Sequence, residues 1–293
     1  MSLTLQGVLG PVVTNFTSSG ELDRTAFAEN IRAHLDAGMS GVVVAGSTGE
    51  AALLDEKERA LLVEVARHTV PADRRLIAGT GAESTRTTLR NTRLAAERGA
   101  DAALVVAPHY YGAKAMTSAA LRAHYTAIAD ASPLPVILYN IPKYMHFALT
   151  SQLVSELAQH ENIVGIKDSS GDLELLAGYI KAQSDDFAVL TGNGSTFKRA
   201  LELGARGGIL AVALFAASLS IEVFEAKSQQ AQERLTPLAA RIVGDMGVAG
   251  VKAALDRVAL AGGPVRSPLL PLGTGELSEV TELLRVAELS VAA

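Results

Sequence analysis

Short apolar runs alternate with longer amphipathic segments along the first three quarters of this chain. Each run is bounded by glycine or polar residues, which is typical of a parallel strand buried on both faces. Strands that alternate with helices predict a parallel sheet, and eight such units favour an α/β fold of the closed (β/α)8 TIM barrel type over an open doubly wound sheet. The predicted strands cover residues 7–16, 41–46, 75–81, 101–108, 134–140, 163–169, 187–193 and 207–213.

The pattern changes after about residue 215, where helical periodicity replaces the alternation. Amphipathic segments at 248–263 and 275–290 are joined by a stretch rich in proline and glycine, and both are predicted to be helices. We therefore assign residues 1–215 to the barrel. Residues 216–293 are assigned to its last helix and a C-terminal helical extension.

Composition argues against several classes of protein. The 293 residues carry 26 basic and 31 acidic side chains, and lysine and arginine do not cluster, so no nucleic-acid partner is expected. The longest apolar stretch, 207–219, is shorter than the roughly 20 residues that span a bilayer, so no membrane segment is expected. Cysteine is absent and residues 1–13 do not resemble a signal peptide, which suits a cytoplasmic protein.

Histidine spacing gives no sign of a metal centre. The six histidines do not recur at the short intervals of metal ligands, and without cysteine no zinc–thiolate site can form. We expect His34 and His68 to lie on helix surfaces. The segment 79–85 begins like a dinucleotide-binding loop but lacks its third glycine, so no organic cofactor is predicted either.

Polar side chains are concentrated where the predicted strands end. In a (β/α)8 barrel the carboxyl ends of all strands meet at one rim, and active sites are built there. These side chains are therefore expected around one cavity. They are Ser47, Thr48 and Glu50 after the second strand, His109, Tyr110 and Tyr111 after the fourth, Tyr139, Asn140 and Lys143 at the end of the fifth, Lys167 in the sixth, and Thr191 and Asn193 at the end of the seventh.

Lys167 is the most informative of these residues, because it directly follows the apolar run 163–166 and its amine is drawn toward the interior. An ion pair with Asp168 or another carboxylate at the rim would explain it structurally. Alternatively, desolvation favours a neutral amine, which can attack a ketone and form an imine. Tyr139 could be an aromatic residue at the water interface, or its phenol could move protons beside that imine.

The turn GSTGE (46–50) has two interpretations as well. It could be only a strand-to-helix turn whose glycines give backbone freedom, or its amides and two hydroxyls could bind a small carboxylate. Tyr110 and Tyr111 could simply pack together in a loop. Glycine-rich segments at 191–195 and 204–208 leave a phosphate-binding barrel open, and a non-catalytic barrel that binds an oxo acid is a third alternative.

Three motifs in this order, GSTGE (46–50), YNIP (139–142) and GIKDSSGD (165–172), resemble the dihydrodipicolinate synthase and N-acetylneuraminate lyase superfamily of class I pyruvate aldolases. The resemblance runs from about residue 7 to residue 290. It implies a lyase with a (β/α)8 barrel, usually assembled as a homotetramer from two dimers. It also implies that pyruvate or a related 2-oxo acid is a substrate and that no metal or organic cofactor is needed.

The resemblance further implies a role for each matching residue. Lys167 corresponds to the lysine that forms the Schiff base with pyruvate, and Tyr139 to the tyrosine that relays protons. Ser47 and Thr48 correspond to the hydroxylated pair that holds the pyruvate carboxylate, and Ser47 would also link to Tyr139. The remaining matches are Tyr110, which would be lent to the site of the neighbouring subunit, and two positions that would line the pyruvate pocket, Asn193 and Leu210.

Several stretches look closer to 4-hydroxy-2-oxoglutarate aldolase, the branch that forms pyruvate and glyoxylate, namely 78–85, 100–130, 162–172 and 247–269. Synthases of the family usually carry an arginine five residues after the tyrosine of the fifth strand, where it binds the distal carboxylate of aspartate semialdehyde. Here that position is Tyr144, preceded by Lys143. The first expectation is therefore this aldolase, the second is 4-hydroxy-tetrahydrodipicolinate synthase, and the third is a 2-keto-3-deoxy sugar acid aldolase.

Overall fold

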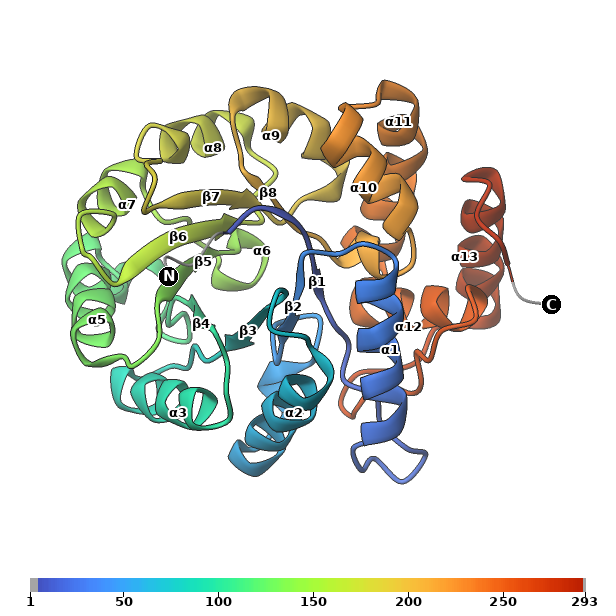
Figure 1. Ribbon diagram of the computed structural model, residues 1–293, viewed down its shortest axis with the longest axis horizontal. Coiled ribbons are helices and arrows are strands. Elements are labelled where there is room, and N and C mark those ends of the chain that lie inside the picture. The colour runs from blue at the N-terminus through green and yellow to red at the C-terminus, as the bar shows by residue number, and fades with distance from the viewer. Residues whose placement is uncertain (1–4, 292–293) are drawn as a thin grey trace.

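In the computed structural model, which describes residues 5–291, eight parallel strands close into a barrel surrounded by helices (Figure 1). Each strand pairs with its neighbours in the sequence, and β1 pairs with β8 to close the barrel, which confirms the predicted (β/α)8 architecture. Residues 1–4, part of the segment considered for a signal peptide, lie outside the described range. The strands are β1 (Gly7–Pro11), β2 (Gly41–Val44), β3 (Arg75–Gly79), β4 (Ala102–Val106), β5 (Val136–Asn140), β6 (Ile163–Asp168), β7 (Ala188–Thr191) and β8 (Gly207–Ile209).

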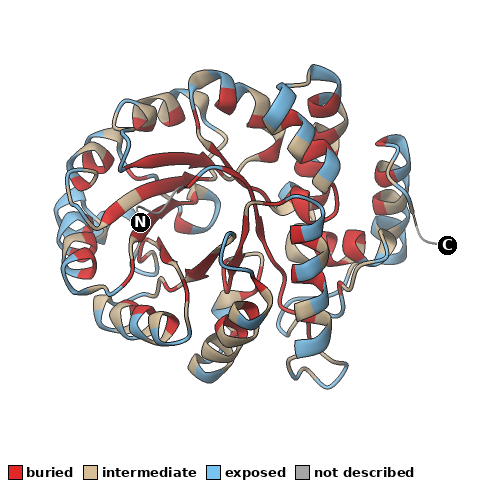
Figure 2. Ribbon diagram, in the orientation of Figure 1, coloured by how far each residue is buried: buried red, intermediate tan, exposed pale blue. Residues whose placement is uncertain are grey.

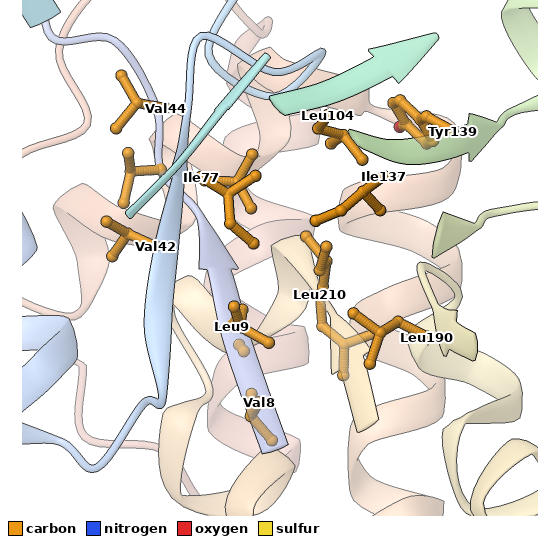
Figure 3. Close-up of a cluster of buried hydrophobic side chains, with 14 of the residues drawn as sticks. Val8, Leu9, Val42, Val44, Ile77, Leu104, Ile137, Tyr139, Leu190 and Leu210 are labelled. Carbon is orange, nitrogen blue, oxygen red and sulfur yellow. The ribbon is translucent and has the colours of Figure 1, made fainter. Parts of the chain in front are cut away.

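Side chains from alternate strands fill the inside of the barrel. Figure 3 shows Leu9, Ile77, Ile137 and Leu190 gathered toward the centre from β1, β3, β5 and β7. All four are buried, and the strands form the buried layer in Figure 2. Successive side chains of a strand point to opposite faces. The residues directly before and after each of these four on its own strand therefore point outward, beneath the outer helices. The barrel is therefore a filled core and not an open channel.

The outer helices present a buried face to the strands and an exposed face to solvent (Figure 2). Several begin at a side chain that accepts a hydrogen bond from a free amide of the first turn, as Asp23 and Ser84 do. The longer helices between the strands are α1 (Arg24–Asp36), α2 (Glu56–Thr69), α3 (Thr85–Glu97), α5 (Ser118–Ala131), α7 (Ser151–Leu157), α8 (Leu173–Ile180) and α9 (Phe197–Leu203). Shorter turns are η1 (Ala51–Leu53), α4 (Gly112–Ala115), α6 (Pro142–Met145), η2 (Gly194–Thr196) and η3 (Ala211–Leu214).

Helices make up the chain after β8, and they lie on one side of the barrel (Figure 1). The two helices expected in the tail are present, but both are shorter than expected. The first of them stops early because Ala259 adopts a left-handed conformation with φ +60°. These helices are α10 (Ala217–Ala226), α11 (Gln229–Pro237), the π-helix η4 (Leu238–Asp245), α12 (Gly247–Arg257) and α13 (Thr274–Val286).

Several expectations about position are wrong. The predicted strand 7–16 ends at Pro11, where the chain leaves the barrel sheet, although Val12 still donates its amide to the carbonyl of Val43 and Phe16 forms an isolated bridge with Leu22. The predicted strand 207–213 ends at Ile209, because the chain then turns into the 3-10 helix η3. His34, expected on a helix surface, is buried, since it shares the inward face of α1 with Phe27 and Ile31 at helical spacing. His68 is exposed on α2, as expected.

Candidate active site

A cavity of about 310 Å³ opens at the carboxyl ends of the strands. Its walls come from the ends of β1, β5, β6, β7 and β8, from the turn after β2, and from η4 and α12. This is the rim at which the sequence predicted the functional side chains. The expected residues that line the cavity are Ser47, Thr48, Tyr139, Lys143, Lys167 and Asn193.

Lys167 and Tyr139 lie next to each other because their strands pair in register. Tyr139 of β5 is the pairing partner of Lys167 of β6, and residues at the same level of neighbouring strands point to the same face of a sheet. Lys167 Nζ lies 4.3 Å from the centre of the Tyr139 ring. The two residues are only 6% and 4% exposed, yet both reach the cavity wall. The amine is thus presented to a small cavity beside a phenol.

Asp168 has other partners and does not explain the position of Lys167. Its carboxylate accepts hydrogen bonds from Asn140 Nδ2 at 2.7 Å and from the amide and hydroxyl of Ser170 at 3.1 and 2.7 Å. Burial raises the pKa of the Asp168 carboxyl, and the hydrogen bonds from Ser170 and Asn140 oppose that rise. Within residues 5–291 no carboxylate forms an ion pair with Lys167. The interpretation of Lys167 as half of an ion pair at the rim is therefore wrong.

The turn after β2 brings Ser47 and Thr48 to the cavity wall. The amide of Glu50 donates to the carbonyl oxygen of Ser47 at 3.1 Å, and the hydroxyl of Thr14 donates to the carbonyl of Gly49 at 2.6 Å. Glu50 has a left-handed backbone with φ +55°, which is uncommon for a residue other than glycine. The turn is therefore held from several sides, and this keeps its two hydroxylated residues at a defined place.

Tyr110 and Leu210 do not line the cavity of the single chain. Tyr110 is 79% exposed, and its ring meets that of Tyr111 edge to face at 5.3 Å between centres. Leu210 is fully buried, while the residues on either side of it, Ile209 and Ala211, line the cavity. Because side chains alternate between faces along an extended segment, the residue between two cavity residues points away from the cavity.

The glycine-rich segments do not form the phosphate cradle that the sequence left open. After β7, the side-chain oxygen of Asn193 accepts hydrogen bonds from the amides of Ser195 and Thr196 at 3.0 and 3.3 Å, so these amides already have a partner. The second segment, 204–208, precedes and begins β8 and therefore lies at the amino end of that strand, away from the rim. The phosphate-binding interpretation is wrong for this chain.

Several residues of the cavity were not singled out from the sequence. Ser169 and Ser170 follow Lys167 within a motif already noted, so their position after β6 was the available signal. The helical tail had no such signal, because nothing local indicates that η4 and α12 close one side of the cavity. The small and apolar residues of that side are Ala239, Ala240, Val243, Gly244, Gly247, Val248 and Val251.

Within residues 5–291, no three histidine or acidic side chains are grouped so that they could hold a metal ion, and no helix is both long and apolar enough to cross a membrane. A closed parallel barrel with a buried lysine amine, a phenol and several hydroxyls at its carboxyl rim defines an α/β-barrel enzyme whose site is built around a lysine.

The chain belongs to the Dihydrodipicolinate synthetase family, whose family profile matches residues 4–287. It is 35% identical over 283 residues to a 4-hydroxy-tetrahydrodipicolinate synthase of Exiguobacterium sibiricum, covering 94% of this chain and 95% of the relative. It is 38% identical over 277 residues to the enzyme of that name from Stenotrophomonas maltophilia, with 92% of each chain covered. The resemblance to this superfamily is thereby confirmed, and the chain is a pyruvate-dependent enzyme of the lyase and synthase class.

Solved structures of the same family resemble this chain in fold. Dihydrodipicolinate synthase from Acinetobacter baumannii, crystallised with pyruvate, superposes with a TM-score of 0.92 at 32% identity and covers 98% of this chain and 100% of its own. A prophage protein of the same family from Escherichia coli K12, also in complex with pyruvate, has a TM-score of 0.92 at 29% identity, with the same shares covered. The special likeness to 4-hydroxy-2-oxoglutarate aldolase has no support among these relatives and stays a prediction.

Proposed function

We propose that Lys167 forms an imine with pyruvate and that the chain makes or breaks a carbon–carbon bond next to that imine. One observation carries this proposal: a nearly buried amine, with no ion-pair partner in the described chain, lies 4.3 Å from the Tyr139 ring at the wall of a small cavity. Two structural neighbours crystallised with pyruvate support the choice of pyruvate as the substrate that forms the imine.

The proposed reaction conserves atoms and charge at each step. The Lys167 amine attacks the C2 carbonyl, and the oxygen leaves as water while the C=N bond forms. In the cleavage direction the C4 hydroxyl loses its proton to the relay that includes Tyr139 and becomes the carbonyl of the released aldehyde. The bond between C3 and C4 breaks at the same time, and its electron pair moves into the iminium to give an enamine. Protonation of the enamine and hydrolysis of the imine then free pyruvate and the amine.

The surrounding residues have roles that follow from where their side chains lie. Tyr139, beside the amine, would carry protons to and from the departing oxygen. Ser47 and Thr48 would hold the carboxylate of pyruvate, and Asn193 would support the wall after β7. Tyr110 would complete the site of a neighbouring subunit, because it is exposed and lies away from the cavity of its own chain.

We therefore also propose a homotetramer built from two dimers, which sedimentation of wild type and Tyr110→Ala would test.

For the aldehyde partner we propose glyoxylate first. Tyr144 stands where synthases of the family usually have the arginine that binds the distal carboxylate of aspartate semialdehyde, and it lines the cavity. Its neighbour Lys143 does not replace that arginine, since Lys143 Nζ donates to the carbonyl of Gly244 at 2.6 Å and a lysine lacks the guanidinium fork. The names of the relatives favour aspartate semialdehyde, the second candidate, and a 2-keto-3-deoxy sugar acid is the third.

Borohydride trapping tests whether Lys167 forms an imine with pyruvate. Protein mixed with pyruvate and sodium borohydride should gain a reduced pyruvyl adduct on Lys167, located by peptide mass spectrometry. Lys167→Ala should lose the adduct, whereas Lys143→Met, which removes another lysine of the same cavity, should keep it. An adduct that survives Lys167→Ala would contradict the assignment.

A comparison of kcat/KM between candidate substrates tests which aldehyde is the partner of pyruvate. Cleavage of 4-hydroxy-2-oxoglutarate should have a higher kcat/KM than condensation of pyruvate with aspartate semialdehyde. The reverse order would identify the synthase, and preference for a 2-keto-3-deoxy sugar acid over both would identify the third candidate.

A further inference from the structure

A buried ion pair joins the two parts of the cavity wall that come from opposite ends of the sequence. Lys252 Nζ of α12 lies 2.5 Å from Glu50 Oε1, and both side chains are almost completely buried. Lys252 follows Val251, which lines the cavity, and Glu50 ends the turn that carries Ser47 and Thr48. The pair therefore links the hydroxylated turn directly to the helical wall.

Further contacts attach the same turn to the C-terminal extension. The second oxygen of Glu50 accepts a hydrogen bond from the amide of Arg266 at 2.8 Å. The guanidinium of Arg266 donates to both carboxylate oxygens of Glu58, at 2.7 and 2.6 Å, near the start of α2. Lys252 Nζ and the Arg266 guanidinium lie 4.6 and 4.2 Å from the centre of the Phe16 ring. Both ends of segment 50–58 are thus held by residues of the tail.

Stability alone does not explain why the buried pair of Glu50 and Lys252 is charged. A buried ion pair contributes little net stability compared with neutral side chains of similar size, because both charges lose their hydration. Removing one partner alone is costly, because it leaves the other charge buried without a partner, so this pair restrains Glu50 and Lys252 to positions in which they meet. Here that restraint acts on Glu50, whose left-handed backbone shapes the turn holding Ser47 at the cavity.

We propose that Glu50 and Lys252 are positioning residues for the substrate carboxylate: their ion pair holds the turn with Ser47 and Thr48 in register with α12. This inference rests on the proposed function, in which that turn binds the carboxylate of pyruvate. It predicts that loss of the pair weakens capture of pyruvate even where the fold is as stable as in the wild type.

The experiment measures the pyruvate concentration that gives half-maximal borohydride trapping on Lys167, together with the urea midpoint of unfolding. Glu50→Gln and Lys252→Met each leave one buried charge alone. The double variant Glu50→Gln/Lys252→Met removes both charges at nearly constant volume and should therefore stay close to wild-type stability. The matched control is Arg67→Met/Asp101→Asn, because this partly buried pair, 3.3 Å apart, lies away from the cavity.

In the double variant, the half-saturating pyruvate concentration should rise by about tenfold to a hundredfold, the loss expected when one hydrogen bond to a charged group is no longer made. The control pair should leave that concentration unchanged even if its urea midpoint falls. Wild-type pyruvate capture in a folded double variant would overturn the positioning role while leaving the imine chemistry intact. Absence of any adduct in the wild type would overturn the proposed function itself, and this inference with it.

Discussion

Lowering the pH from 7 to 5 should destabilise this protein, in part through His34. The ring is buried on the inward face of α1, and within the described chain its Nε2 has no hydrogen-bond partner. Burial lowers the pKa of His34 from 6.5 to about 4, because a charged imidazole would lose its hydration there. As the pH falls, the unfolded chain therefore takes up the proton first, and this favours unfolding.

The magnitude follows from proton linkage. The contribution is fully present above pH 6.5, the ordinary value, declines between pH 6.5 and about 4, and levels off below that. At pH 5 the loss amounts to about 2 kcal/mol, and it approaches about 3 kcal/mol at lower pH. His124, whose pKa burial also lowers to about 4 against the opposing charge of Glu83, should add a loss of similar size.

Urea unfolding of wild type and His34→Phe at pH 7 and pH 5 measures this. Phenylalanine keeps a ring of similar size but cannot bind the proton, so the free energy of unfolding of the variant should gain about 2 kcal/mol relative to wild type on going to pH 5. His68→Phe, at an exposed position of α2, is the control and should show no such change. A His34→Phe difference that stays constant with pH would refute the reasoning, because it would mean that the native ring is protonated as easily as the unfolded one.

Three further predictions concern the site. Tyr139→Phe should slow turnover by roughly two to four orders of magnitude, the usual worth of a general acid or base, while urea stability stays near wild type; a rate within threefold of wild type would remove the phenol from proton transfer. Gly192→Ala should lower kcat by about a hundredfold, since a methyl there would lie 1.9 Å from Ser169 Oγ and 2.9 Å from Lys167 Cε; normal kinetics would show that both can move aside. Tyr144→Arg should raise kcat/KM for aspartate semialdehyde relative to glyoxylate, and an unchanged ratio would separate this position from partner choice.

The barrel and its rim could be predicted from local patterns. Apolar runs of strand length, each followed by an amphipathic segment, leave few ways to bury both kinds of element, and a closed barrel is one of them. The rule that chemistry gathers at the carboxyl ends then selected Lys167, Tyr139 and the turn with Ser47 without any knowledge of distances. Strand lengths were overestimated, since rim loops such as 12–16 are as apolar as the strands that precede them.

Side-chain direction was harder to predict. Leu210 was placed in the pocket wall, but the cavity is lined by the residues on either side of it, because a shift of one residue along an extended segment reverses the face. His34 was placed on a surface for a related reason: a histidine is usually exposed, yet its spacing from Ile31 puts it on the buried face of α1.

The order of strands and helices could be predicted from short-range periodicity, and three motifs at strand ends carried the resemblance to the family together with Lys167 and Tyr139. The register that places Tyr139 beside Lys167, the closure of the cavity and the contacts that hold its turn are visible only in the folded chain. The wall from η4 and α12 and the contact of Glu50 with Lys252 join segments distant in the chain, and such contacts depend on how whole elements pack.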